Sequence, residues 1–213
     1  VGGGRRNSVL GSYSVIGGGR QNYVHSDYAA ISGGFGNTVI GTAAFVGGGY
    51  GNEALGNGAF VGGGGDYNQT TNTFHGNSAY GVGSAILGGF DNSAAGLGSV
   101  VLGSNNDVSG EYSVAMGQRA NVPHANAAAF GFSRTDNCDS VGDGTLNICV
   151  EGGMFVNGES VLTGVLATGR DAVIGGGTSN IASGDYSVAA GGQSNNASHI
   201  FSTVGGGTSN TAR

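Results

Sequence analysis

Lysine and tryptophan are absent from this 213-residue sequence, which holds a single proline, two cysteines, 7 cationic and 13 acidic side chains. One proline excludes collagen, because the Gly-X-Y triple helix depends on abundant proline. A hydrophobic share of 38% excludes a flexible glycine linker, and so few charges do not fit a disordered chain. The 48 glycines therefore have a structural role.

The charge distribution limits the partners. The net charge is −6 and no cation cluster exceeds Arg5-Arg6, so we expect no nucleic-acid partner. No apolar run approaches the length of a membrane span, so we expect no membrane insertion of this segment. The chain opens within a motif, Val1-Gly2-Gly3-Gly4, and we expect it to be part of a longer protein. Without lysine it cannot carry a P-loop, and we predict no cofactor.

An internal repeat with a period of 14 or 15 residues dominates the sequence. Its marker is an asparagine that follows a glycine cluster, at Asn7, Asn22, Asn37, Asn52, Asn92, Asn106, Asn121, Asn180, Asn195 and Asn210. A small apolar residue stands two positions later, with Pro123 as the exception. A second apolar column follows the asparagine at Ile16, Ile31, Val46, Val61, Met116 and Val204.

The repeat predicts a β-solenoid. Apolar residues come in short bursts between glycine turns, and no stretch keeps a helical period, so helices are excluded. Two short strands joined by Gly and Asn turns fit one unit, which makes each unit one coil of a parallel all-β roll. The recurring asparagines then form a ladder in which each side chain caps the same turn of its coil. A row of ligand-binding amides is the alternative.

Two interruptions set the expected domain organisation. Residues 1–132 form β-roll repeats with a protruding polar loop inserted at about 65–85, and residues 166–213 form further β-roll repeats. Between them, residues 133–165 have a different rhythm. There Asn157-Gly158, between two apolar bursts, is a strong hairpin signal, so we predict a small β-hairpin insert.

The chain offers little chemistry. Cys138 and Cys149 lack a metal-ligand pattern and predict a local disulfide, with two buried thiols as the alternative; a disulfide favours an extracellular setting. The three aspartates at 136, 139 and 143 indicate a solvated turn or a Ca²⁺ loop. The four histidines fall at unrelated repeat positions and indicate surface loop residues. We predict no catalytic, cofactor-binding or metal residues and no enzymatic activity.

A coil of fifteen residues is narrow and buries little apolar surface by itself. Phe45 and Phe60 predict an outer apolar face along the roll, which identical copies would cover by packing around an axis. We therefore expect a homo-oligomer, with a homotrimer as the preferred form.

Specific motifs support this expectation. Ser113-Val114-Ala115-Met116-Gly117-Gln118-Arg119-Ala120 is similar to the S-V-A-I-G-x-x-A signature of the YadA-like head of trimeric autotransporter adhesins, and Tyr186-Ser187-Val188-Ala189-Ala190-Gly191-Gly192 is a near relative. This resemblance implies a left-handed parallel β-roll, wound as a homotrimer and serving surface attachment. Val46-Gly47-Gly48-Gly49-x-x-Asn52 also resembles glycine-rich repeats in fibre proteins of phages and large viruses.

The functional prediction is a non-enzymatic trimeric fibre or adhesin segment. It would present an attachment surface on a cell or virion and bind a host surface receptor or glycan. Its location would be extracellular, on a cell or virion surface. The alternative is a purely structural shaft or capsid-associated fibre of a virus or phage. The loops at 66–80 and 133–147 are the first candidates for recognition, because function concentrates in loops on a rigid scaffold.

Overall fold

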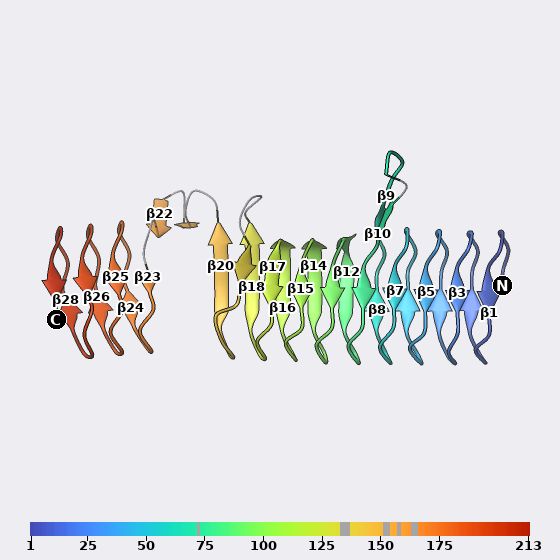
Figure 1. Ribbon diagram of the computed structural model, residues 1–213, viewed down its shortest axis with the longest axis horizontal. Coiled ribbons are helices and arrows are strands. Elements are labelled where there is room, and N and C mark those ends of the chain that lie inside the picture. Colours follow the sequence, from blue (N-terminus) through green and yellow to red (C-terminus); the bar gives the residue numbers. More distant parts are fainter. Residues whose placement is uncertain (72, 133–136, 151–153, 157–158, 163–165) are drawn as a thin grey trace. The chain divides into compact units, whose positions relative to one another are not determined.

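The structure is a computed structural model that describes all residues except 72, 133–136, 151–153, 157–158 and 163–165 (Figure 1). The chain divides into two compact units, Val1–Cys149 and Val150–Arg213. Every regular element in the described part of the chain is a β-strand, and none is a helix. The predicted all-β class and the parallel β-solenoid are confirmed.

The first unit is built from two parallel sheets of nine strands each. Each coil contributes one strand to each sheet, so strand order advances by two along both sheets, except at the steps from β7 to β11 and from β8 to β12, where two extra strands intervene. The first sheet contains β1 (Ser8–Val9), β3 (Tyr23–Val24), β5 (Thr38–Val39), β7 (Glu53–Ala54), β11 (Ser78–Ala79), β13 (Ser93–Ala94), β15 (Asp107–Val108), β17 (Ala120–Val122) and β19 (Cys138–Asp139).

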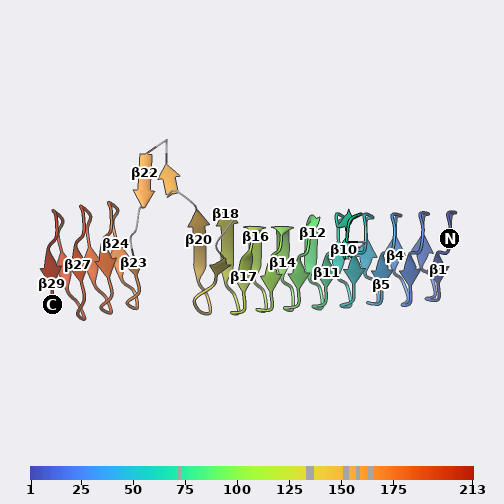
Figure 2. The ribbon, with the colours of Figure 1, turned by 45° about the horizontal axis from the view of Figure 1, so that its top comes forward.

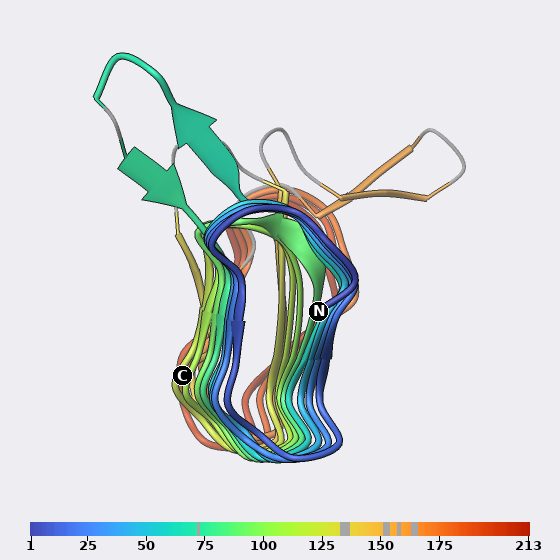
Figure 3. The same ribbon diagram turned by 90° about the vertical axis from the view of Figure 1, so that its right-hand side faces the viewer.

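The second sheet of this unit contains β2 (Val15–Ile16), β4 (Ala30–Ile31), β6 (Phe45–Val46), β8 (Phe60–Val61), β12 (Ala85–Phe90), β14 (Val100–Ser104), β16 (Val114–Gln118), β18 (Ala128–Phe132) and β20 (Leu146–Val150). Seen end-on, these two sheets are the two walls of the coil, joined by rounded corners (Figure 3). We refer to them as the odd sheet, from β1 to β19, and the even sheet, from β2 to β20. An antiparallel pair, β9 (Asp66–Asn68) and β10 (Thr73–His75), leaves the coil after β8.

The second unit repeats the same plan on a smaller scale. One parallel sheet contains β23 (Leu166–Ala167), β25 (Ile181–Ala182), β27 (Asn196–Ala197) and β29 (Thr211–Ala212), and the other contains β24 (Val173–Ile174), β26 (Val188–Ala189) and β28 (Thr203–Val204). Two further strands, β21 (Met154–Val156) and β22 (Glu159–Leu162), pair antiparallel. The Asn157-Gly158 turn that the sequence predicts between them lies outside the described residues.

Alternation along each two-residue strand builds the core. In most of these strands the first residue faces outward and the second faces the interior, as side chains alternate across a strand; β19 is the reverse, with Cys138 buried and Asp139 exposed. Ile16, Ile31 and Val46 on the even sheet are fully buried, as are Val24 and Val39 on the odd sheet. Successive coils are stacked one after another (Figure 2). Their strands pair in register, so each sheet contributes one apolar column to a narrow interior.

The apolar column predicted from the sequence is wrong at Met116. Val101 pairs in register with Ala115, which is fully buried, whereas Met116 is 38% exposed. The reason is the strand alternation, because Met116 follows the buried residue of β16 and therefore points to the opposite side. The interior has room for the smaller alanine at this coil.

Glycine is required where the coil turns between the even sheet and the next odd strand. Gly19 has a φ of +89°, and a Cβ there would collide with the carbonyl oxygen of Gly34 on the following coil. The preceding Gly18 has no neighbour within 4 Å of the corresponding point. The glycine cluster of each repeat thus combines one position that only glycine fills with another that tolerates a side chain.

Candidate functional site

An asparagine ladder runs through the first unit at the turn before each odd strand. The Asn37 side chain donates from Nδ2 to the carbonyl oxygens of Gly33, 3.0 Å away, and of Gly49 on the next coil, also 3.0 Å away. Its backbone N–H donates to Oδ1 of Asn22 over 3.0 Å. Because Asn37 is fully buried, these bonds satisfy the polar atoms of its side chain and its backbone N–H away from water. The ladder therefore links three successive coils at every step.

The ladder contains one member that the fifteen-residue spacing did not reveal. Asn77 lies 25 residues after Asn52, is fully buried, and donates its backbone N–H to Asn52 Oδ1 over 3.0 Å. The β9–β10 pair occupies the extra residues. A search that allowed one insertion in the glycine cluster would have found Asn77, because Gly76-Asn77 keeps the local motif.

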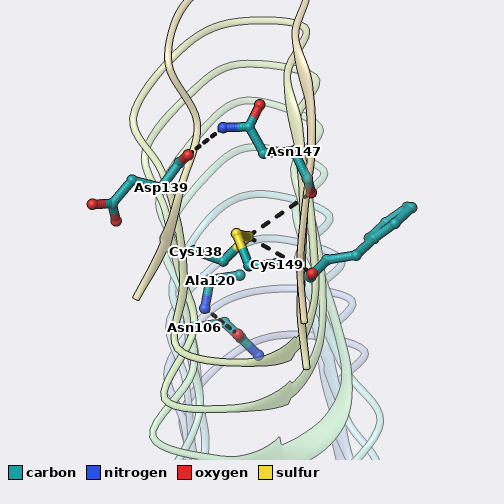
Figure 4. Close-up of a disulfide and its surroundings, with 7 residues drawn as sticks. Asn106, Ala120, Cys138, Asp139, Asn147 and Cys149 are labelled. Atoms are coloured by element: carbon teal, nitrogen blue, oxygen red, sulfur yellow. Dashed lines mark hydrogen bonds between the residues drawn. A yellow bond between two sulfur atoms is a disulfide. The ribbon is translucent and has the colours of Figure 1, made fainter. Parts of the chain in front are cut away.

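The predicted ladder is wrong at Asn121. Ala120 occupies this position of the ladder, and its backbone N–H donates to Asn106 Oδ1 over 2.9 Å (Figure 4). Asn121 pairs in register with Asp107 and points outward from β17. This also removes the Pro123 exception, because the buried apolar residue of that coil is Val122, in register with Val108. The ladder loses its side-chain amide at this coil but keeps its backbone donor.

A second, shorter ladder lies in the second unit. Asn180 donates from Nδ2 to Gly176, 2.8 Å away, and to Gly192, 2.9 Å away. Asn195 and Asn210 continue the series, each donating its backbone N–H to the Oδ1 of the asparagine before it. In the first unit, Asn7 accepts the backbone N–H of Asn22 and completes the series there. All these amides serve the fold, and their polar atoms face neighbouring coils.

A disulfide joins Cys138 of β19 to Cys149 of β20, with a Cα–Cα distance of 5.5 Å (Figure 4). Cys138 is fully buried and pairs in register with Ala120, so its sulfur occupies the interior of the coil. The bond connects the odd sheet to the even sheet across that interior. Next to it, the side-chain amide of Asn147 donates to the carbonyl oxygen of Asp139. The two walls of this coil are therefore tied covalently.

The aspartates near this disulfide do not assemble into a site in the described part of the chain. Asp143 accepts the backbone N–H of Ala125 over 3.0 Å, which is a turn contact. Asp136 lies outside the described residues. Among the residues that the structure describes, no three His, Cys, Asp or Glu side chains gather as a metal site requires.

The segment expected as a polar loop at about 65–85 forms an antiparallel hairpin, β9–β10, that stands away from the coil (Figure 3). Its aromatic residues explain the difference. Phe74 stacks on Phe35 at the coil corner, with centroids 5.4 Å apart, and Tyr67 packs on Phe74 at 5.0 Å. Arg20 lies over the other end of this cluster, 5.3 Å from the Phe35 ring. The hairpin is therefore anchored to the solenoid by an aromatic contact.

Apolar side chains are also exposed on the outer face of the even sheet. Phe45 and Phe60 are in register and stack at 5.5 Å, and Phe60 is 38% exposed. Leu87, Leu102 and Met116 continue the exposure along the same sheet. We call these five residues the apolar strip. Exposed apolar area of this kind marks interaction surfaces more often than inert ones.

No helix in the described part of the chain is long and apolar enough to cross a membrane.

Comparison with known proteins gives one finding that agrees with this geometry. No curated protein matches the chain. The YadA head domain repeat family matches residues 94–120, 109–133 and 177–194. These ranges contain the Ser113–Ala120 and Tyr186–Gly192 motifs and fall in both compact units. The resemblance to the YadA-like head that the sequence indicates is therefore confirmed for these residues, which are similar to YadA head domain repeats.

Proposed function

We propose that this chain is a non-enzymatic, extracellular attachment segment, wound as a left-handed homotrimeric β-roll on a cell or virion surface. The observation that carries the proposal is the match to YadA head repeats in both units, because this family suggests an adhesin of the trimeric autotransporter type. In this role the asparagine ladders and the disulfide make a rigid support. The antiparallel pair β21–β22 is proposed as a small insert between two runs of β-roll repeats; it is shorter than the predicted range 133–165, because β19 and β20 continue the two parallel sheets of the first run.

The apolar strip supports the trimer. A monomer would leave Phe60, Leu87 and Leu102 in water along one sheet, and three copies that pack around an axis would cover them. The interior supports it as well, because its columns consist mainly of alanine, valine and isoleucine and bury little area in each coil. The odd sheet, with the β9–β10 hairpin at its corner, would remain available for a host surface receptor or glycan.

Light scattering and a cell-attachment assay test the two parts of the proposal. We expect a mass near three times 20.7 kDa and saturable binding of labelled protein to host cells. A stable monomer would contradict the trimer. A trimer that binds no host surface would contradict the attachment role and favour the second candidate, a structural shaft of a virus or phage.

A further inference from the structure

A hollow of about 410 Å³ lies at the foot of the β9–β10 hairpin. It is lined by the glycine backbone at Gly51 and Gly76 and by Glu53, Phe74, Ser78 and Asp91. A volume of this size falls within the ~300–1,000 Å³ typical of small-ligand sites. All of these residues belong to the first compact unit.

The coil corner itself creates this space. Gln21 occupies the corner position on the second coil, and Asn105 occupies it further along the unit, so a side chain fills the corner there. On three successive coils between them the residue before the ladder asparagine is glycine, at Gly36, Gly51 and Gly76, and on the coil after these it is Asp91. Three corners without side chains leave the backbone open, and the inserted hairpin adds a wall beside them. The hollow is therefore a feature of this region and not of the repeat.

The aromatic wall is fixed in place. Phe74 is 46% exposed although Phe35 and Tyr67 both pack against its ring. Gly51 allows the close approach, because a Cβ at this position would lie 3.0 Å from the Cβ of Phe74. An exposed ring held in this way presents apolar surface to a ligand at little cost in conformational entropy.

Acceptor groups face the same hollow. Glu53 accepts the hydroxyl of Ser78 over 3.3 Å, and Asp91 lies 2.8 Å from His75 Nδ1. A carboxylate has about four lone-pair sites, so each retains capacity for further donors. On the hairpin, Thr71 and Thr73 are 2.7 Å apart through their hydroxyls, and Thr73 lies 3.3 Å from His75 Nε2. These two hydroxyl groups lie on the hairpin and are connected through His75 to Asp91, which lines the hollow.

We propose that this hollow binds a neutral saccharide of a host-surface glycan. Sugar hydroxyls are donors that carboxylates accept in short, charge-assisted bonds, and the apolar C–H surface of a sugar suits the Phe74 ring. None of the residues named as lining is cationic, and the whole chain carries a net charge of −6, so sialylated and sulfated glycans are disfavoured. This inference rests on the proposed attachment function and assigns its ligand class and its residues.

A glycan array tests the assignment. The full chain is applied to immobilised neutral, sialylated and sulfated oligosaccharides and to an oligoarginine peptide. We expect binding to neutral oligosaccharides, followed by titration of the bound sugar in solution. Glu53→Ala and Asp91→Ala should each weaken this affinity at least tenfold, because a charged acceptor is lost.

Asp107→Ala is the matched control. Asp107 pairs in register with Ser93, which follows Ser78 and Glu53 in the same outward column, and it lies outside the hollow. We expect unchanged affinity for this variant and unchanged circular dichroism for all three. Binding that is equal in Glu53→Ala and Asp107→Ala would overturn the proposal. So would an array on which only charged glycans, only the peptide, or no probe is bound.

The cell assay separates this proposal from the attachment role. If the unmodified chain attaches to cells and Glu53→Ala attaches equally well, the hollow is not the site, although attachment stands. If neutral sugar binding maps to the hollow while no cell type is bound, the saccharide site stands and the attachment role fails.

Discussion

At the scale of single residues, the fold depends on corner positions where a residue has a positive φ and its backbone also bonds to a neighbouring coil. Among the residues that the structure describes, sixteen that are not glycine, including Tyr13, Tyr28 and Ala43, adopt a positive φ at the coil corners. Each such residue costs about 1–2 kcal/mol relative to right-handed backbone. The backbone hydrogen bonds between coils offset that cost, as when Tyr28 donates its N–H to the Ser12 carbonyl over 2.9 Å. The corner therefore accepts many side chains, whereas the turn at Gly19 does not.

Gly19→Ala should destabilise the solenoid by about 2 kcal/mol or more. The substitution adds the left-handed backbone penalty of ~1–2 kcal/mol to a collision with the Gly34 carbonyl. Gly18→Ala is the control, because a Cβ there meets nothing within 4 Å. Chemical denaturation measures both. Equal stability of the two variants would show that the coil relaxes freely at Gly19.

Asn37→Ala should cost about 2–4 kcal/mol. The change leaves the Gly33 carbonyl and the Asn52 N–H without the Asn37 side chain, at ~1–3 kcal/mol for each unsatisfied group before local relaxation, whereas the Gly49 carbonyl keeps the N–H of Phe35. Asn57→Ala removes one exposed bond, from the Thr42 N–H over 3.0 Å, and should cost less than about 1 kcal/mol. Thermal unfolding compares the pair. Similar unfolding midpoints of Asn37→Ala and Asn57→Ala would show that the ladder does not stabilise the fold.

At the scale of elements, the β9–β10 hairpin is an addition to an otherwise regular coil. Asn52 and Asn77 are 25 residues apart, and the hairpin with its turn occupies residues 66–75. Gly65 donates its backbone N–H to Gly89, as Tyr50 does to Gly64 one coil earlier. The backbone before and after the hairpin therefore already has the course of an uninterrupted coil.

Deleting residues 66–75 should leave a folded solenoid. The deletion joins Gly65 to Gly76 and restores the 15-residue spacing that Asn77 and Asn92 show. We expect a circular dichroism spectrum and an unfolding midpoint close to those of the full chain. Deleting residues 78–87 is the control of equal length, and because it removes β11 and part of β12 it should prevent cooperative folding. Loss of structure in the 66–75 deletion would mean that the hairpin nucleates the coil.

The disulfide should stabilise the coil formed by β19 and β20. It closes a loop with a sequence separation of 11, for which the chain-entropy account gives roughly 2–3 kcal/mol. We expect Cys138→Ser with Cys149→Ser to raise amide hydrogen exchange in residues 137–149 and to leave residues 8–61 unchanged, because each coil contacts mainly its neighbours. A uniform rise across the first unit would show that the disulfide supports the whole unit.

At the scale of the molecule, the features that recur in every coil can be predicted from the sequence, and the features that occur in only one coil cannot. The period, the absence of helices and the buried apolar residue after each asparagine follow from spacing alone, as at Val24 and Val39. The hairpin could not be predicted as a hairpin, because the contact of Phe74 with Phe35 joins residues far apart in the sequence. The ladder position predicted at Asn121 is wrong because the step from Asn106 is 14 residues and ends at Ala120, which has no amide side chain.

The candidate binding site shows the same division. Glu53 and Asp91 share no repeat position, so spacing alone does not connect them, and only the stacking of coils brings both to one hollow. The three glycine corners were visible as part of the repeat, but their lack of side chains matters only beside the hairpin. Periodicity therefore reveals the scaffold, while a surface site depends on departures from it.

The trimer can be tested through the apolar strip. Leu102 lies on the outer face of β14, is 37% exposed, and pairs in register with Met116. A glutamate is tolerated there in a single roll, but burying its charge against another copy is costly without a partner charge. We therefore expect Leu102→Glu to reduce the mass measured by light scattering from three copies to one, with the β-rich spectrum retained.

Leu10→Glu is the control, since Leu10 is 63% exposed and follows β1 of the odd sheet, so this variant should remain trimeric. Dissociation by Leu10→Glu alone would place the contact between copies on the odd sheet and would also remove that sheet as a surface for ligands.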